Sequence, residues 1–189
     1  MTLAAVLGAE TYTETVDGII WTYTVLNGEA SVGGGSSSPP AVSASTSGAI
    51  VIPSTLGGRP VTSIGNSAFR DCNKLTSVTI PGGVTRIGSH AFSACSNLTS
   101  VVISNGVTSI GFQAFSSCGE LTSVVIGDSV TSIGVDAFYG CNSALFDTTT
   151  IRNVKLVDGW VVGHTGSLSG VLNLSGGSWY CRLCVLKRH

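Results

Sequence analysis

A phrase of 23 residues occurs four times in succession, and this repetition constrains the fold more than any other feature of the chain. The copies begin at Val61, Val84, Val107 and Val130 with no insertion between them, and the third copy reads VTSIGFQAFSSCGELTSVVIGDS. A fixed period in this range is typical of a solenoid, in which each copy forms one coil that buries its apolar face by stacking on its neighbours. We therefore predict a repeat solenoid, and its coil is the 23-residue phrase.

Short strands joined by sharp bends make up most of each predicted coil. Leu75, Val78 and Ile80 follow an L-x-x-V-x-I spacing, in which a short strand turns its larger side chains inward. Val61 and Ile64 mark a second short extended segment in the same phrase. The strands are short because the chain must bend at every corner of a coil.

The middle of each copy predicts one short helical turn. Ala68 and Cys72 are four residues apart, so a helical turn places them on the same side, with Phe69 close by. The equivalent phenylalanines then stack as a ladder in the core: Phe69, Phe92, Phe115 and Phe138. The glycine before the turn predicts a corner where a left-handed or crowded backbone excludes other residues; its copies are Gly65, Gly88, Gly111 and Gly134.

The repeated phrase resembles the BspA-like leucine-rich repeats of bacterial surface and secreted proteins, which have the form V-T-S-I-G-x-x-A-F-x-x-C-x-x-L-T-S-V-x-I-P. The match runs from Val61 to Cys141 and continues more weakly into both flanks, as in IVIPSTLGGRPVTSIG from Ile50. The resemblance implies a right-handed solenoid and binding or attachment roles at cell surfaces. It implies no catalytic activity.

The flanks of the repeats predict further β structure. Residues 10–48 alternate apolar and polar positions around Asp17-Gly18 and Asn27-Gly28, which predicts an antiparallel β cap on the first coil, followed by a flexible connection rich in Gly, Ser and Pro. We place the leucine-rich repeat solenoid at 49–143, and a β hairpin with a partial repeat at 144–178. The tail, 179–189, breaks in composition from the rest and is interpreted as an irregular, truncated or frame-shifted end.

The first residues, 1–9, are short and apolar and precede a polar shift at Glu10. They fit either the remnant of a signal peptide or a buried N-terminal strand, because the run lacks the basic start of a complete signal. Together with a surface built mainly from Ser, Thr, Asn and Gly, this start favours a secreted or cell-surface protein. The oligomeric state does not follow from the sequence.

Composition excludes several classes of partner. The formal net charge is -1 at pH 7, with nine Lys and Arg against ten Asp and Glu, so the chain lacks the basic surface that nucleic acid binding requires. No stretch approaches the roughly 20 apolar residues of a membrane span. We therefore predict that the chain does not bind nucleic acid and is not an integral membrane protein.

The cysteines at Cys72, Cys95, Cys118 and Cys141 recur at the repeat period, so stacking places neighbours about 4.8 Å apart. That distance allows a disulfide, but side chains in register point the same way, whereas a disulfide needs a dihedral near 90°. Buried reduced thiols are the favoured interpretation, with disulfides as the alternative. A zinc site is excluded because its ligands must converge on one point, whereas a ladder spreads the sulfur atoms along a line.

No motif for catalysis, a metal or a cofactor is present. Cys181 and Cys184 have C-x-x-C spacing, but no second pair accompanies them. His90 and His164 have no acid or nucleophile partner in the sequence and are interpreted as surface residues. We predict that the chain is not an enzyme and holds no cofactor.

A candidate ligand-binding strip follows the outward positions of the predicted strands. One residue of each strand must point outward between the inward Val and Ile, which gives Thr79, Val102 and Val125, flanked by Ser77, Ser100 and Ser123. This strip is flat, neutral and mildly apolar, and solenoids commonly bind partners on such a face. Phe112, at the corner before Ala114, is a further candidate anchor, although packing against a neighbouring coil is the favoured interpretation.

Three functions remain open. The first is a non-catalytic module that binds a protein or glycan through the strand face. The second is a structural spacer within a larger surface protein, with no ligand of its own. The third is an enzyme whose catalytic part is absent from this chain.

Overall fold

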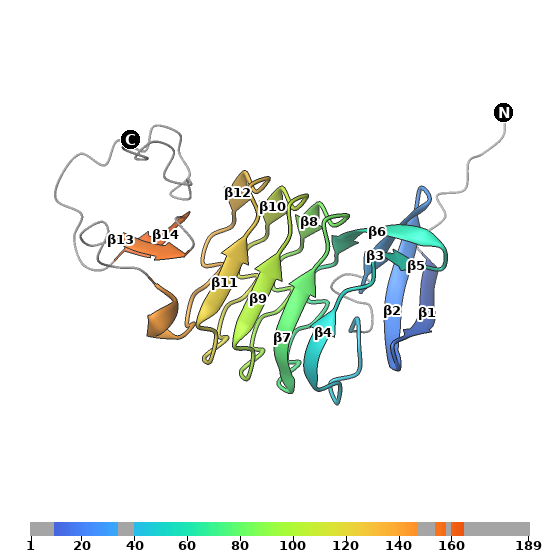
Figure 1. Ribbon diagram of the computed structural model, residues 1–189, viewed down its shortest axis with the longest axis horizontal. Helices are drawn as coiled ribbons and strands as arrows, with labels where there is room; N and C mark the ends of the chain where they lie inside the picture. The colour runs from blue at the N-terminus through green and yellow to red at the C-terminus, as the bar shows by residue number, and fades with distance from the viewer. Residues whose placement is uncertain (1–9, 34–39, 147–153, 158–159, 165–189) are drawn as a thin grey trace.

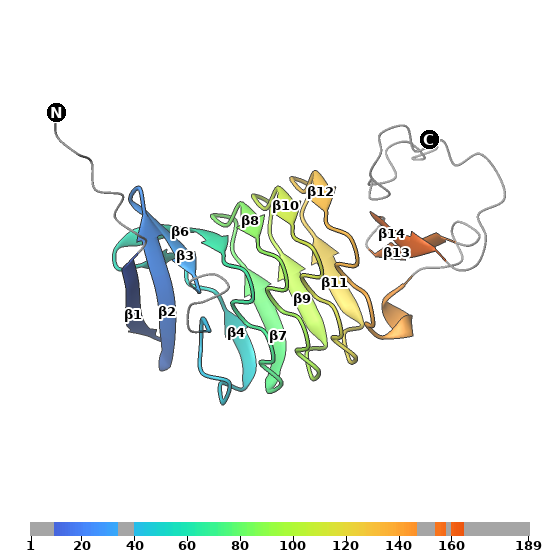
Figure 2. The same ribbon diagram turned by 180° about the vertical axis from the view of Figure 1, so that it is seen from behind.

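The computed structural model describes residues 10–33, 40–146, 154–157 and 160–164, and these form a β-solenoid with a strand-built cap at its N-terminal end (Figure 1). The coils follow one another along a single axis, and each passes through two sheets (Figures 1 and 2). The predicted repeat solenoid is therefore confirmed. The predicted tail and partial repeat from residue 165 onward lie outside the described residues, as do residues 1–9.

The first sheet joins the cap to the coils. Its strands are paired in the order β1 (Glu10–Val16), β2 (Ile19–Leu26), β3 (Glu29–Val32), β6 (Arg59–Ile64), β8 (Arg86–Ile87), β10 (Ser109–Ile110) and β12 (Ser132–Ile133), and β5 (Thr55–Leu56) pairs with β6. The pairs β1–β2 and β2–β3 are antiparallel, whereas β3–β6 and the later pairs along that order are parallel. The predicted antiparallel β cap is thus confirmed, and it continues the sheet of the solenoid.

The turns of the cap have the backbone that their sequence predicts. Asp17 and Gly18 have φ of 51° and 76°, and Asn27 and Gly28 have φ of 52° and 85°. Positive φ at both central residues is the type I′ geometry that two-residue hairpins favour, because its twist matches that of the strands.

The second sheet forms the other long side of the solenoid. Its strands, all parallel, are paired in the order β11 (Ser123–Ile126), β9 (Ser100–Ile103), β7 (Leu75–Ile80) and β4 (Gly48–Val51). A short 3-10 helix, η1 (Ser143–Leu145), follows the last described coil. β13 (Val154–Val157) and β14 (Trp160–His164) pair with each other as a hairpin, and in the described part of the chain this hairpin pairs with no other strand.

The segment between the two sheets differs from the predicted helical turn. From Ser67 to Cys72 the backbone amides alternate: that of Ser67 donates to Ser89 of the next coil, and that of Arg70 donates back to Ser67. Ser67 and Asp71 have φ of 56° and 60°, which no α-helical turn contains. The chain makes consecutive turns here because half of its amides bond across coils, which holds Phe69 inward without a helix.

The core runs through the whole stack between the two sheets. The phenylalanine ladder is present: neighbouring rings of Phe69, Phe92, Phe115 and Phe138 have centroids 4.7, 5.1 and 5.4 Å apart. Trp21 of the cap contacts the first ring edge-on at 6.1 Å, so the cap closes the N-terminal end of the core. Within the described residues, no helix is long and apolar enough to cross a membrane.

Candidate binding face

The outward face of the second sheet carries two rows of small side chains. Parallel pairing in register aligns the first row, which we call the valine row, across all four strands: Val51, Thr79, Val102 and Val125. The second row, one pleat away, is Ala49, Ser77, Ser100 and Ser123. The structure therefore brings together six of the seven residues that the sequence predicts for the strip.

Strand alternation explains why the valine row faces solvent. Val101 and Ile103 are each 1% exposed and face the core, whereas Val102 between them is 41% exposed. Val51 and Val125 are 64% and 52% exposed. Burial of one face fixes the register of every strand, because a slip of one residue would turn the whole apolar set outward.

Val51 extends the strip beyond the sequence prediction. It occupies the position between Ile50 and Ile52 that Thr79 occupies between Val78 and Ile80. Aligning the strand of the first, weaker coil with the later copies would have identified it, but the long turn at 53–58 interrupts that copy.

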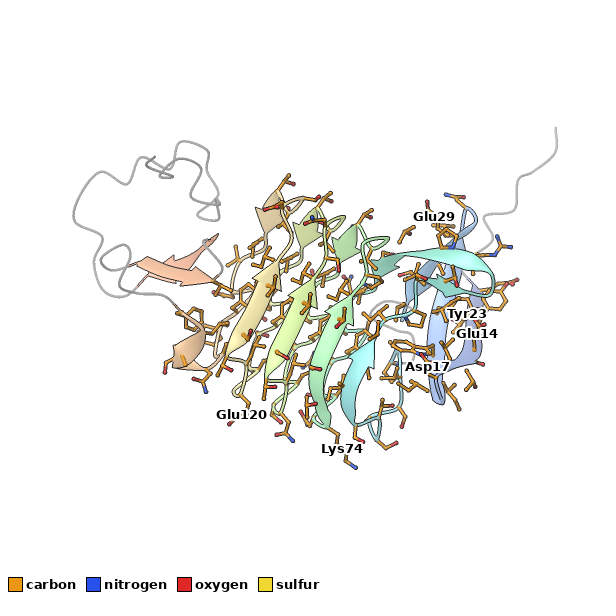
Figure 3. All side chains as sticks on the ribbon, viewed as in Figure 1. Glu14, Asp17, Tyr23, Glu29, Lys74 and Glu120 are labelled. Atoms are coloured by element: carbon orange, nitrogen blue, oxygen red, sulfur yellow. The ribbon has the colours of Figure 1, made fainter. Side chains whose placement is uncertain are left out.

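The two rows contain no charged residue. Charged residues flank the strands: Lys74 precedes β7 and Glu120 precedes β11 at the margin that Figure 3 shows, and Asp128 follows β11. The threonines at that margin are linked between coils: the Thr99 hydroxyl donates to the carbonyl of Thr76 at 2.9 Å. The face therefore offers flat apolar contact with hydroxyl groups beside it, and it has no strong field of either sign.

Phe112 lies away from the valine row. It follows β10 of the other sheet, is 43% exposed, and its ring contacts the ring of the partly buried His90 in the preceding coil edge-on at 5.2 Å. Val135 and Tyr139 in the next coil are 53% and 67% exposed, and sequence reasoning did not include Tyr139 in the candidate site. This corner is a separate surface from the strip.

The repeated cysteines are free thiols, and no disulfide joins them. The thiol of Cys95 donates to the carbonyl of Phe69 at 3.0 Å, and that of Cys118 donates to Phe92 at 3.1 Å. Burial raises the pKa of Cys72 to about 11, and the nearby charge of Asp71 adds to the effect. A neutral, buried thiol that bonds a backbone carbonyl is a poor nucleophile and a poor metal ligand.

The described residues contain no group of three or more His, Cys, Asp or Glu side chains that could hold a metal ion. Cys181 and Cys184 lie outside the described residues, and so does the side chain of His164.

Comparison with known proteins decides the family. Residues 48–160, more than half of the chain, match the BspA type Leucine rich repeat region in six copies. The chain belongs to the BspA-type leucine-rich repeat family. No protein with a curated description matches it in sequence.

Two solved bacterial leucine-rich repeat proteins support the same fold. The chain is 33% identical to one from Bacteroides ovatus, over 69% of this chain and 33% of that one, with a TM-score of 0.53. It is 31% identical to one from Bacteroides capillosus, over 64% of this chain and 86% of that one, with a TM-score of 0.52. The chain thus spans about a third of the length of the Bacteroides ovatus protein.

Proposed function

We propose that this BspA-type repeat is a non-catalytic binding module of a secreted or cell-surface protein, and that it binds a protein or glycan through the valine row and the hydroxyl groups beside it. The observation that supports the proposal is the row itself: three exposed valines stand in register on a flat face with no charged residue. The resemblance of the repeat phrase to bacterial surface and secreted proteins supports the location.

A partner that covers the exposed valines would gain free energy from the apolar area that it removes from water. Isolated apolar side chains are common on surfaces, but Val102 and Val125 are neighbours in register and Val51 follows them beyond Thr79. Grouped apolar side chains on a surface mark interaction sites. The sheet is held by backbone pairing on several strands, so the row needs little reordering on binding, which lowers the entropic cost of association.

The test compares Val102→Glu and Val125→Glu with Val135→Glu. All three change an exposed valine to the same charged residue, but Val135 lies at the corner, outside the row. Binding would be measured to a panel of immobilised extracellular matrix proteins and glycans, with circular dichroism and urea unfolding as checks on folding.

We expect Val102→Glu and Val125→Glu to weaken binding by about tenfold or more, because a buried, unpaired carboxylate opposes association. Val135→Glu should bind as the unsubstituted chain does. If all three variants bind alike, the row is not the binding site. If the unsubstituted chain binds no member of the panel, the role of a structural spacer is favoured instead.

A further inference from the structure

Among the described residues, the first sheet ends in a strand that has no neighbour on its outer edge. β1 is the outermost strand at the N-terminal end of the molecule (Figures 1 and 2), and among the described residues it pairs only with β2. Its pairing with β2 runs through all seven residues of the strand, with no register shift. An uninterrupted edge of this length is a template on which another strand can pair.

Three threonines present their backbone groups at this edge. In a two-residue hairpin the residues that flank the turn, Val16 and Ile19, exchange hydrogen bonds, and every second pair does the same. Thr13 stands opposite Thr22, whose carbonyl accepts from Gly33 and whose amide donates to Ala41, so Thr22 bonds away from β1. Thr13 must likewise bond away from β2, and Thr11 and Thr15 share its orientation.

The edge lacks most of the features that prevent strand addition. β1, with the sequence ETYTETV, contains no proline, lysine or bulge, and Thr11, Thr13 and Thr15 are all exposed. Threonine is β-branched and favours the extended backbone that an added strand would extend. The strand does have one inward-pointing charged side chain. The Glu14 carboxylate accepts a hydrogen bond from the amide of Gly57 at 2.6 Å, which fixes β1 against the β5–β6 turn.

Charge indicates what kind of strand fits. Residues 10–33 contain Glu10, Glu14, Asp17 and Glu29 and no lysine or arginine, and Figure 3 shows three of these carboxylates on the cap. The side chain of Arg59, beside the Asn27-Gly28 turn, offsets only part of this charge. An added strand that carries lysine or arginine gains attractive cross-strand pairs.

We propose that the edge of β1 binds an extended, basic peptide segment of another protein by strand addition. A second copy of this chain is disfavoured as the occupant, because pairing two β1 edges would bring together two caps whose acidic residues outnumber the nearby Arg59. The inference is independent of the valine row, which lies on the other sheet.

The experiment uses the full chain labelled with nitrogen-15 and a capped synthetic peptide of about eight residues that alternates valine and lysine. Amide hydrogen exchange should slow by about tenfold or more at Thr11, Thr13 and Thr15, because these amides gain partners. Exchange at Tyr12 and Glu14 should change little, since their amides already bond β2. A peptide that alternates valine and glutamate should bind at least about tenfold more weakly.

Thr13→Pro removes one outward amide without touching the bonds to β2, and edge strands tolerate proline at such positions. We expect this variant to bind the basic peptide about tenfold more weakly, whereas Thr13→Val, which keeps the backbone amide, should bind normally. Thr11→Pro serves as a second variant if Thr13→Pro does not fold.

Three results would overturn the proposal. The first is unchanged exchange at the three threonines when the peptide is in excess. The second is equal binding of the two peptides, which would remove the role of charge. The third is dimerisation of the chain in sedimentation experiments that Thr13→Pro abolishes, because a second copy would then be the occupant.

Discussion

At the scale of single residues, the glycines before each turn show how closely the coils stack. A Cβ placed on Gly111 would lie 2.6 Å from the carbonyl carbon of Gly88, and one on Gly134 would lie 2.5 Å from that of Gly111. These contacts are with backbone atoms, which cannot rotate away. The sequence allowed two reasons for these glycines, a left-handed backbone or crowding, and crowding is the correct one. The residues with a left-handed backbone lie elsewhere in the corner and include Ser67 and Asp71.

Gly111→Ala should lower the free energy of unfolding by about 1 to 3 kcal/mol, because a methyl group forces two coils apart. Gly119→Ala is the matched control, since a Cβ there meets no atom within 4 Å. Its effect should stay within about 0.5 kcal/mol. Urea unfolding of both variants checks this, and equal stability would show that the coils can move apart at no cost.

At the scale of structural elements, columns of identical residues join the coils. The Phe69 and Phe92 rings are 3° from parallel, and the Phe92 and Phe115 rings are 0° from parallel. Threonines form a second column outside the core: the hydroxyl of Thr85 donates to Thr62 at 3.1 Å, and that of Thr108 donates to Thr85 at 3.0 Å. One repeated residue type thus supplies the same contact at each interface between coils.

Phe92 is fully buried between two other rings, and its replacement by alanine leaves a cavity in the middle of the column. We expect Phe92→Ala to cost about 3 to 5 kcal/mol in the free energy of unfolding. Phe112→Ala removes the same ring from an exposed site and should cost much less. Denaturant titration measures both, and a loss of comparable size in the two variants would contradict the ladder as the main source of core stability.

The buried cysteines make the stability of the fold depend on pH in the alkaline range. The folded Cys72 thiol has a pKa of about 11 against an ordinary 9.0, so it binds its proton more tightly when folded. The protonated thiol therefore makes its full contribution to the free energy of unfolding below pH 9, and this contribution is lost as the pH rises toward 11. The loss is on the order of 2 kcal/mol.

Unfolding by urea at a series of pH values between about 8 and 11 measures this loss. The Cys72→Ala variant should show a shallower fall in stability over the same range. If the free energy of unfolding falls equally with pH in the variant and in the unsubstituted chain, then Cys72 ionises equally in the folded and unfolded states, and the argument from burial fails.

At the scale of the whole molecule, stability depends on stacking and very little on charge. The ion pair between Arg70 and Asp71, at 3.6 Å, lies on the surface, and both of its side chains are more than half exposed. The core instead passes without interruption from Trp21 in the cap to Val157 in β13. Each coil is buried by its two neighbours, so the interfaces between coils carry most of the stability.

Raising sodium chloride from about 0.05 to about 0.5 M should change the free energy of unfolding by less than about 1 kcal/mol, because exposed ion pairs contribute little and salt screens them. The same salt series should weaken binding of the valine–lysine peptide at β1, since that interaction depends on charge. A large salt effect on unfolding would show that charge contributes more to the fold than the ion pair indicates.

The sequence by itself determined the solenoid, the phenylalanine ladder, the outward positions of the strands and the turns of the cap. These features depend on local rules: a fixed period requires stacking, alternation sets the two faces of a strand, and Asp-Gly or Asn-Gly favours a tight hairpin. Val102 could be named as outward because Val101 and Ile103 beside it had to be inward.

Other features depend on contacts between coils and between strands, and only the tertiary structure revealed them. Consecutive turns replace the predicted helix because the amides of Ser67 and Phe69 find partners in the next coil, which no local pattern reveals. Phe112 and the valine row belong to different sheets, although the sequence placed them in one candidate site. The position of β1 at the edge of the described sheet likewise follows from strand order, because whether a strand has a neighbour is a property of the assembled sheet and not of its own residues.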